Sequence, residues 1–95
     1  MAGPTCFVLL EPKEVPLERI DALLAALANK IERTRKGRVW DIWIRDRPIH
    51  VAVVGPPFEV QMSAGCNSPE DYEILRQISR EIVNTIGGIA GEPIK

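Results

Sequence analysis

The sequence predicts a two-layer α+β sandwich in which both helices cover one face of a four-stranded mixed sheet. Two segments carry apolar residues at helical spacing, and each segment forms a single apolar stripe. Three later segments alternate apolar and polar residues, as strands do when only one face is buried. A common core requires all these apolar surfaces to meet. We therefore expect one domain, residues 1–95, with the order β-α-β-β-β-α.

The segment TCFVLLE, residues 5–11, predicts the first strand, because it is a short apolar run bounded by prolines. Unlike the later strands, it is apolar on both faces. We expect Phe7 and Leu9 to face the helices. The side chains expected on the opposite face are Cys6, Val8 and Leu10.

Residues 16–36 predict the first helix, with Pro16 in the first turn and Gly37 ending it. The apolar stripe consists of Ile20, Leu23, Leu24, Leu27 and Ile31. A helix of about twenty residues spans roughly 30 Å and returns the chain to its starting level. The first and second strands are therefore expected to run parallel.

Residues 39–44, 48–54 and 57–64 predict an antiparallel meander of three strands. Matching the apolar faces pairs Ile44 with Ile49, which sets Trp43 opposite His50. The same matching pairs Val53 with Phe58, which sets His50 opposite Gln61. A register shift of two would change the partners but would leave these residues on the outer face.

Residues 68–86 predict the second helix, with Ser68 as the N-cap and Pro69 in the first helical position. Leu75, Ile78, Ile82 and Ile86 form its apolar stripe. Two glycines end the helix, and residues 88–95 are expected to form a flexible tail.

Composition limits the class of protein. The 95 residues include 12 basic and 13 acidic side chains, so the net charge of −1 gives no general attraction for polyanions. The apolar run near the start is too short for a signal sequence or a membrane span. Two cysteines do not make a disulfide framework. We expect a cytoplasmic protein with two free thiols and no membrane partner.

The outward position of Trp43, among polar neighbours, predicts an interaction surface on the open side of the sheet. The residues expected to form this surface are Val8, Leu10, Trp43, Arg45, His50, Ala52, Val54 and Gln61. The sequence favours a small noncatalytic protein-interaction module that binds another protein or a second copy of itself as a homodimer. It does not distinguish an adaptor from a chaperone or an inhibitor.

Catalytic chemistry has little support. His50 is the one histidine and lacks a nucleophile or metal-binding companion, so we expect no metal and no cofactor, and the sequence favours a protein that is not an enzyme. The alternative is a thiol-dependent enzyme or sensor centred on Cys66, which precedes a helix N-terminus.

A second alternative is a weak nucleic-acid binder. Five basic residues cluster before the meander: Lys30, Arg33, Arg35, Lys36 and Arg38. Such a cluster can contact phosphates. However, cations are also favoured at the C-terminus of a helix, and no aromatic platform accompanies them. From the sequence, nucleic acid is not expected as a partner.

Overall fold

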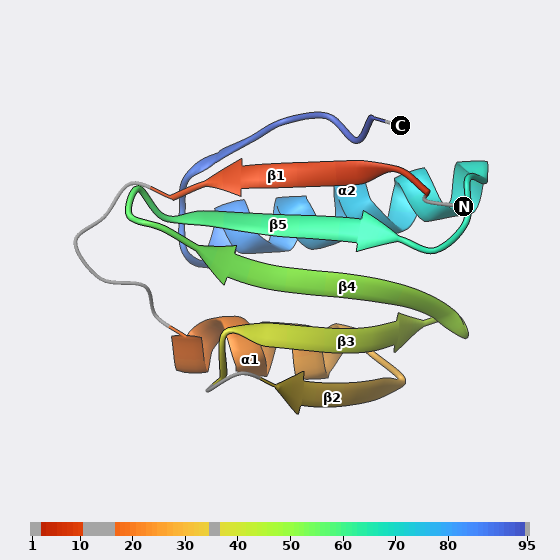
Figure 1. Cartoon of the computed structure of the whole chain (residues 1–95), viewed down its shortest axis with the longest axis horizontal. Coiled ribbons are helices and arrows are strands. Elements are labelled where there is room, and N and C mark those ends of the chain that lie inside the picture. The colour runs from red at the N-terminus through yellow and green to blue at the C-terminus, as the bar shows by residue number, and fades with distance from the viewer. Residues whose placement is uncertain (1–2, 11–16, 35–36, 95) are drawn as a thin grey trace.

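A computed structural model describes residues 3–10, 17–34 and 37–94 of the chain. Over these residues, a single antiparallel sheet carries two helices on one of its faces (Figure 1). The elements, in chain order, are β1 (Thr5–Leu9), α1 (Leu17–Leu27), β2 (Lys30–Thr34), β3 (Val39–Ile44), β4 (Arg47–Val54), β5 (Glu59–Ala64), α2 (Pro69–Thr85) and β6 (Ile89–Ala90).

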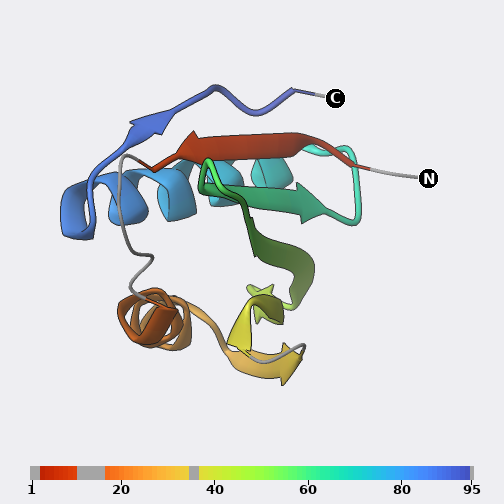
Figure 2. The same ribbon diagram turned by 60° about the vertical axis from the view of Figure 1, so that its left-hand side comes forward.

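The sheet has six strands in the order β2-β3-β4-β5-β1-β6, and every neighbouring pair is antiparallel. The prediction of a four-stranded mixed sheet is therefore wrong. The two strands that the sequence did not predict, β2 and β6, are the edges of the sheet. In Figure 2, α2 lies against β1 and β5, and α1 lies near β2 and β3.

The first helix is shorter than predicted because the chain leaves it after Leu27 and enters a strand. The backbone N–H of Asn29 donates to the carbonyl oxygen of Trp43 at 2.7 Å, and the Asn29 side chain accepts from the N–H of Arg45 at 2.8 Å. The helical spacing misled because Ile31, its last apolar residue, packs from β2 opposite Ile42. The predicted start at Pro16 lies outside the described residues.

The additional strand reverses the chain direction once more before the meander begins. As a consequence, β1 is antiparallel to β3, whereas the sequence predicted that these two strands run parallel. The neighbour of β1 in the sheet is β5, and Cys6 of β1 lies opposite Met62 of β5. A helix of about twenty residues would have returned the chain to its starting level, but α1 has only 11 residues and β2 follows it.

The end of the chain pairs with β1, where the sequence predicted a flexible tail. Ile89 lies opposite Leu9, and the backbones of Ile94 and Thr5 exchange hydrogen bonds of 2.6 and 2.8 Å. Gly88 makes this approach possible. Its φ is +108°, and a Cβ atom there would lie 2.6 Å from the carbonyl oxygen of Leu9.

The core lies between the sheet and the helices and is filled by alternate strand residues. In β3, Trp40, Ile42 and Ile44 are buried, and the same alternation continues through β4 and β5. The helices contribute six buried apolar side chains: Ile20, Leu24, Ile74, Leu75, Ile78 and Ile82. Both helices of the described residues lie on this side, so neither covers the opposite face of the sheet (Figure 1).

The second helix is fixed at its N-terminus by a buried ionic contact. Ser68 accepts a hydrogen bond from the N–H of Asp71, as the sequence predicts for an N-cap. The buried carboxylate of Asp71 also accepts from the guanidinium of Arg47 at 3.0 Å. This contact ties the start of β4 to the helix, and breaking one partner would leave a buried charge uncompensated.

The first helix is tied to the edge of the sheet by Asp21. Its carboxylate accepts from Arg33 on β2 at 2.5 and 3.0 Å and from the Trp40 indole on β3 at 2.9 Å. The hydrogen bonds from Arg33 lower the pKa of Asp21 below its ordinary value of 3.8. Partial burial opposes this shift, and the bond from Trp40 adds to it. One side chain thus joins three elements.

A depressed carboxyl pKa predicts a stability that depends on pH. The contribution of the ionised Asp21 carboxylate is present above pH 3.8 and is lost as pH falls through the lower pKa of the folded protein. We expect Asp21→Asn to lower the free energy of unfolding at pH 6, and the difference from the wild type to shrink below about pH 4. Urea denaturation at a series of pH values measures this. A difference that does not change with pH would contradict the assignment.

Candidate functional site

The uncovered face of the sheet carries its side chains in rows that cross the strands. We call this face the open face. The central row, here called the polar row, runs across five strands because each member lies opposite the next: Glu32, Asp41, His50, Ser63 and Thr5. At about 4.8 Å between neighbouring strands, the row is about 19 Å long. It is the longest run of polar groups on the open face.

Two further rows flank the polar row. On one side lie Lys30, Trp43 and Pro48, which occupy β2, β3 and β4. On the other side the row combines small, amide and aromatic side chains: Thr34, Val39, Ala52, Gln61 and Phe7. The open face thus has a polar centre, and each flanking row combines apolar or aromatic groups with polar ones.

The structure places the meander residues of the predicted interaction surface on the open face, but it places those of the first strand on the other side. Trp43, His50, Ala52, Val54 and Gln61 lie on the open face, although the register differs by two residues. Asp41, rather than Trp43, is opposite His50, and Ser63, rather than Gln61, is its partner on β5.

In the first strand, the two sides are exchanged relative to the prediction. Val8 and Leu10 face the helices and are buried, so they are not part of an outer surface. Phe7 and Leu9 lie on the open face instead and are 40% and 45% exposed. A strand that is apolar on both sides gives no alternation from which to choose its orientation, and this is why the prediction failed.

Arg45 does not extend the open face. It occupies the turn between β3 and β4 with a φ of +53°, and its guanidinium lies 3.4 Å from the Glu70 carboxylate at the start of α2. The turn therefore directs this side chain toward the helix layer.

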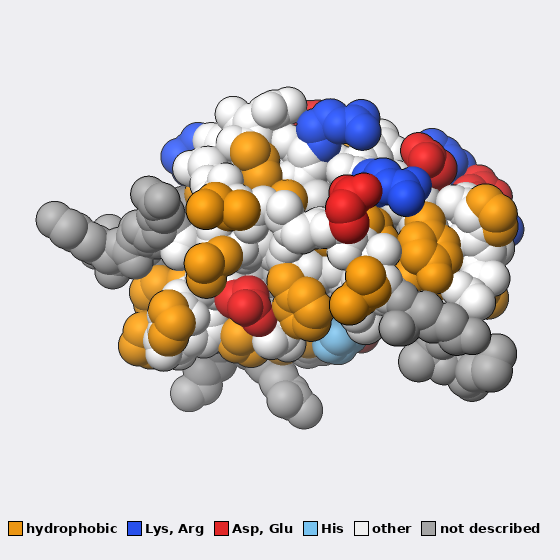
Figure 3. Space-filling model, turned by 90° about the horizontal axis from the view of Figure 1, so that it is seen from above, with side chains coloured by type: hydrophobic (Ala, Val, Ile, Leu, Met, Phe, Trp, Pro, Cys, Tyr) orange, Lys and Arg blue, Asp and Glu red, His pale blue; other side chains and the backbone are white. Residues whose placement is uncertain are grey.

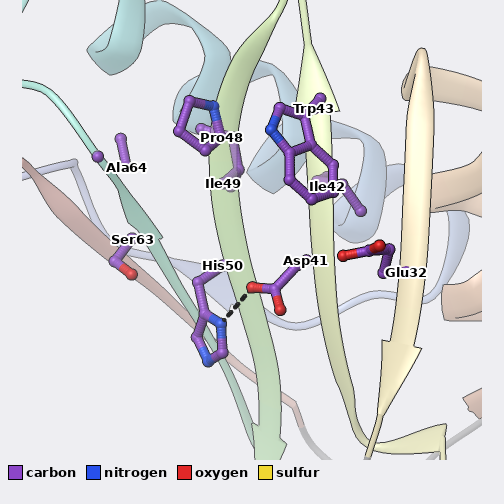
Figure 4. A pocket seen from close by; sticks show the side chains of 10 residues that line it. Glu32, Asp41, Ile42, Trp43, Pro48, Ile49, His50, Ser63 and Ala64 are labelled. Atoms are coloured by element: carbon purple, nitrogen blue, oxygen red, sulfur yellow. Dashed lines mark hydrogen bonds and ion pairs between the residues drawn. The ribbon is translucent and has the colours of Figure 1, made fainter.

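The centre of the polar row is a hydrogen-bonded pair. The Nδ1 atom of His50 lies 2.8 Å from Oδ1 of Asp41 (Figure 4). Both side chains are about half exposed. Glu32 lies beside Asp41 on the adjacent strand, and Ser63 lies on the other side of His50. The row presents carboxylate oxygens toward β2 and hydroxyl groups toward β1.

Trp43 is partly covered by its own neighbours. The ammonium of Lys30 lies 4.7 Å from the centroid of the indole, which is a cation–π contact, and Pro48 lies opposite on β4. Figure 4 shows the indole and the proline ring on neighbouring strands. Trp43 therefore has packing partners within the chain, although it lies on the polar side of its strand. Its indole packs against the Lys30 ammonium and beside Pro48.

Three hollows border His50. One of about 340 Å³ separates the polar row from Trp43 and Pro48. A second, of about 590 Å³, is lined by Thr34, Arg38, Ala52 and Val54. The third, of about 230 Å³, lies between His50, Phe7 and Gln61. The small side chains of Ala52 and Ser63 leave this space on the open face.

Apolar side chains are exposed toward the β1 and β6 edge of the sheet. Figure 3 shows hydrophobic groups gathered over this edge. Among the described residues, the large apolar side chains that are more than one-third exposed are Phe7, Leu9, Val54, Ile89 and Ile94. The open face is therefore polar near β2 and apolar near β6.

The basic cluster is divided between two faces. Lys30 lies on the open face, whereas Arg33 points to the helix side and binds Asp21. Arg38 is exposed and lines the 590 Å³ hollow. The predicted members Arg35 and Lys36 lie outside the described residues. Lys30 and Arg38 are thus the described members that border the open face.

The two cysteines are free: Cys6 is buried in the core, and Cys66 is exposed before α2. The Cys6 thiol lies 3.1 Å from the hydroxyl of Ser79. Among the described residues, no group of three or more His, Cys, Asp or Glu side chains is arranged to hold a metal ion. No helix in the same residues is long and apolar enough to cross a membrane.

Comparison with known proteins gives one informative similarity. The chain is 30% identical over 93 residues to the large ribosomal subunit protein uL16 of Sorangium cellulosum (strain So ce56). The alignment covers 98% of this chain and 63% of that protein. No family model matches the chain. No solved structure matches it.

This similarity overturns the functional interpretation made from the sequence. A noncatalytic protein-interaction module that forms homodimers is not what a relative in the large ribosomal subunit indicates. The expectation that nucleic acid is not a partner also loses its support. That expectation depended on the net charge and on the absence of an aromatic platform, yet Phe7 lies exposed on the open face.

Two members of the polar row, Glu32 and Thr5, were not expected on the open face. Glu32 was predicted to lie in the first helix, and the strand that contains Thr5 was predicted with its two faces exchanged.

The two tryptophans allow a test of which side of the sheet is the core. Trp40 is fully buried, so Trp40→Ala is expected to lower the free energy of unfolding by about 3–5 kcal/mol. Trp43→Ala removes a partly covered indole and one cation–π contact, and a loss of about 1 kcal/mol is expected. Denaturation by guanidinium chloride measures both. Equal losses would show that the open face has been assigned to the wrong side.

Proposed function

We propose that this protein binds RNA of the large ribosomal subunit. The observation that carries the proposal is the similarity to uL16, because it extends over 98% of the chain and is not confined to one motif. The chain spans 63% of the length of that relative, so the proposal concerns only the part that the two proteins share. A role on the ribosome also agrees with the cytoplasmic location expected from the sequence.

The open face supports this function. An uncovered antiparallel sheet with exposed aromatic groups is a common platform for RNA, on which bases stack against side chains. Phe7 and His50 are exposed on two strands of this sheet, and hollows lie beside both. The neighbouring polar row supplies hydrogen-bonding groups at the same level of the sheet.

The charge of the chain predicts an unusual mode of binding for a ribosomal protein. A net charge of −1 cannot provide affinity by neutralising many phosphates. Of the described basic residues, Lys30 and Arg38 border the open face, and their contribution is local. Binding is therefore expected to depend on contacts with bases and sugars more than on charge.

Filter binding to protein-free RNA of the large subunit tests the proposal, with small-subunit RNA as the control. We expect the protein to bind the large-subunit RNA more tightly. The logarithm of the association constant should fall with the logarithm of salt concentration with a slope of roughly −1 to −2 if the two described cations that border the open face, Lys30 and Arg38, each contact one phosphate.

Removing one of the two cations that border the open face tests whether phosphate contacts cause that salt dependence. Arg38→Ala should make the slope shallower by about 0.7 to 0.9, which is the effect of one phosphate contact. Arg80→Ala, on the exposed side of α2, is the matched control and should leave the slope unchanged. Absence of binding to the large-subunit RNA at about 50 mM salt would overturn the proposed function.

A further inference from the structure

We infer that the open face contacts unpaired RNA bases, with the polar row accepting hydrogen bonds from their exocyclic amino groups and Phe7 stacking on a base. This inference rests on the proposed function and assigns it a ligand class and a binding mode. The occupant is a single-stranded RNA segment. The charges, the hydrogen-bonding groups and the exposed rings of the open face each support it.

The charges on the open face separate the phosphates from the bases. Two carboxylates, Glu32 and Asp41, are adjacent in the polar row, and Glu59 lies farther along the same face. Phosphates placed over these groups would be repelled. The described cations Lys30 and Arg38 lie at the border near β2 and β3, where the Lys30 ammonium is also 3.9 Å from the Glu32 carboxylate. An RNA strand that complements this pattern has its phosphates at that border and its bases over the polar row.

The polar row is suited to base edges. A carboxylate accepts a hydrogen bond from the amino group of cytosine, and adenine carries an equivalent amino group. Uracil lacks one and presents a carbonyl oxygen in its place. Because Glu32 and Asp41 can only accept hydrogen bonds when ionised, the carboxylate end of the row favours bases that carry an amino group.

The rings available for stacking are Phe7 and His50. The indole of Trp43 is already in contact with the ammonium of Lys30, and this contact occupies one of its faces. By contrast, Phe7 is 40% exposed and borders the 230 Å³ hollow that it shares with His50 and Gln61. A base placed in this hollow would lie against the phenyl ring and would have an amide group within reach.

A base-paired helix does not fit this face equally well. Its phosphates line the outside of both strands, and its base edges are largely occupied by pairing. Laid across the sheet, it would bring phosphates close to Glu32, Asp41 and Glu59. The charge pattern of the open face therefore favours an unpaired segment.

Two oligoribonucleotides that differ in the amino group test the inference by fluorescence anisotropy. Octacytidylate is expected to bind the wild type roughly 5-fold or more tightly than octauridylate, and to compete with large-subunit RNA. Equal affinity for both oligonucleotides, or failure of octacytidylate to compete while the large-subunit RNA still binds, would overturn the inference and leave the proposed function intact.

Three variants locate the binding face. Phe7→Leu keeps an apolar side chain but removes the ring, and should weaken octacytidylate binding roughly 5- to 100-fold. Glu32→Gln should weaken it several-fold if a base amine faces the carboxylate, whereas it should strengthen binding if a phosphate does. Glu81→Gln on α2 is the matched control and should have no effect. Stronger binding by Glu32→Gln, or an unchanged affinity of Phe7→Leu, would contradict the assigned mode. Because these side chains are not buried, circular dichroism of each variant should match the wild type.

Discussion

Burial on one side only is the constraint on which the rest of this structure depends. The strands β3, β4 and β5 each place alternate residues in the core, and both helices cover the same side of the sheet. The intervening residues must then lie together on the other side, because successive side chains of a strand point to opposite faces. The polar row and its neighbours follow directly from this alternation, and no separate device is needed to assemble them.

The edge strand β2 shows how packing of the core determines the open face. Asp21 joins α1 to Arg33 of β2 and Trp40 of β3, so the strand is held in register by a contact on the helix side. The same register places Lys30 beside Trp43 and Glu32 beside Asp41 on the open face. A carboxylate in the helix layer thus positions groups on the opposite side of the sheet that do not touch it.

The sequence predicted correctly those parts of the fold in which the spacing of apolar and capping residues fits only one kind of secondary structure. The alternation in β3 to β5 identified the outward residues, and Ser68 identified the start of α2. It failed where a pattern had two interpretations. Ile31 continued a helical spacing although it belongs to a strand, and β1 was apolar on both faces. The proposed function was not expected from the sequence for a further reason: the net charge of −1 argued against RNA, although base contacts do not require a basic protein.

The similarity to uL16 and the near-neutral charge are compatible if affinity comes from bases on an uncovered sheet, and this requires the open face to be on the side of Trp43. Hydrogen exchange of the two indole N–H groups, followed by NMR, tests that claim most directly. The Trp40 indole is fully buried and donates to Asp21 at 2.9 Å, so its proton should exchange slowly. The Trp43 indole should exchange much faster. Equal protection of both protons, or slower exchange at Trp43, would show that the sheet is covered on the other side.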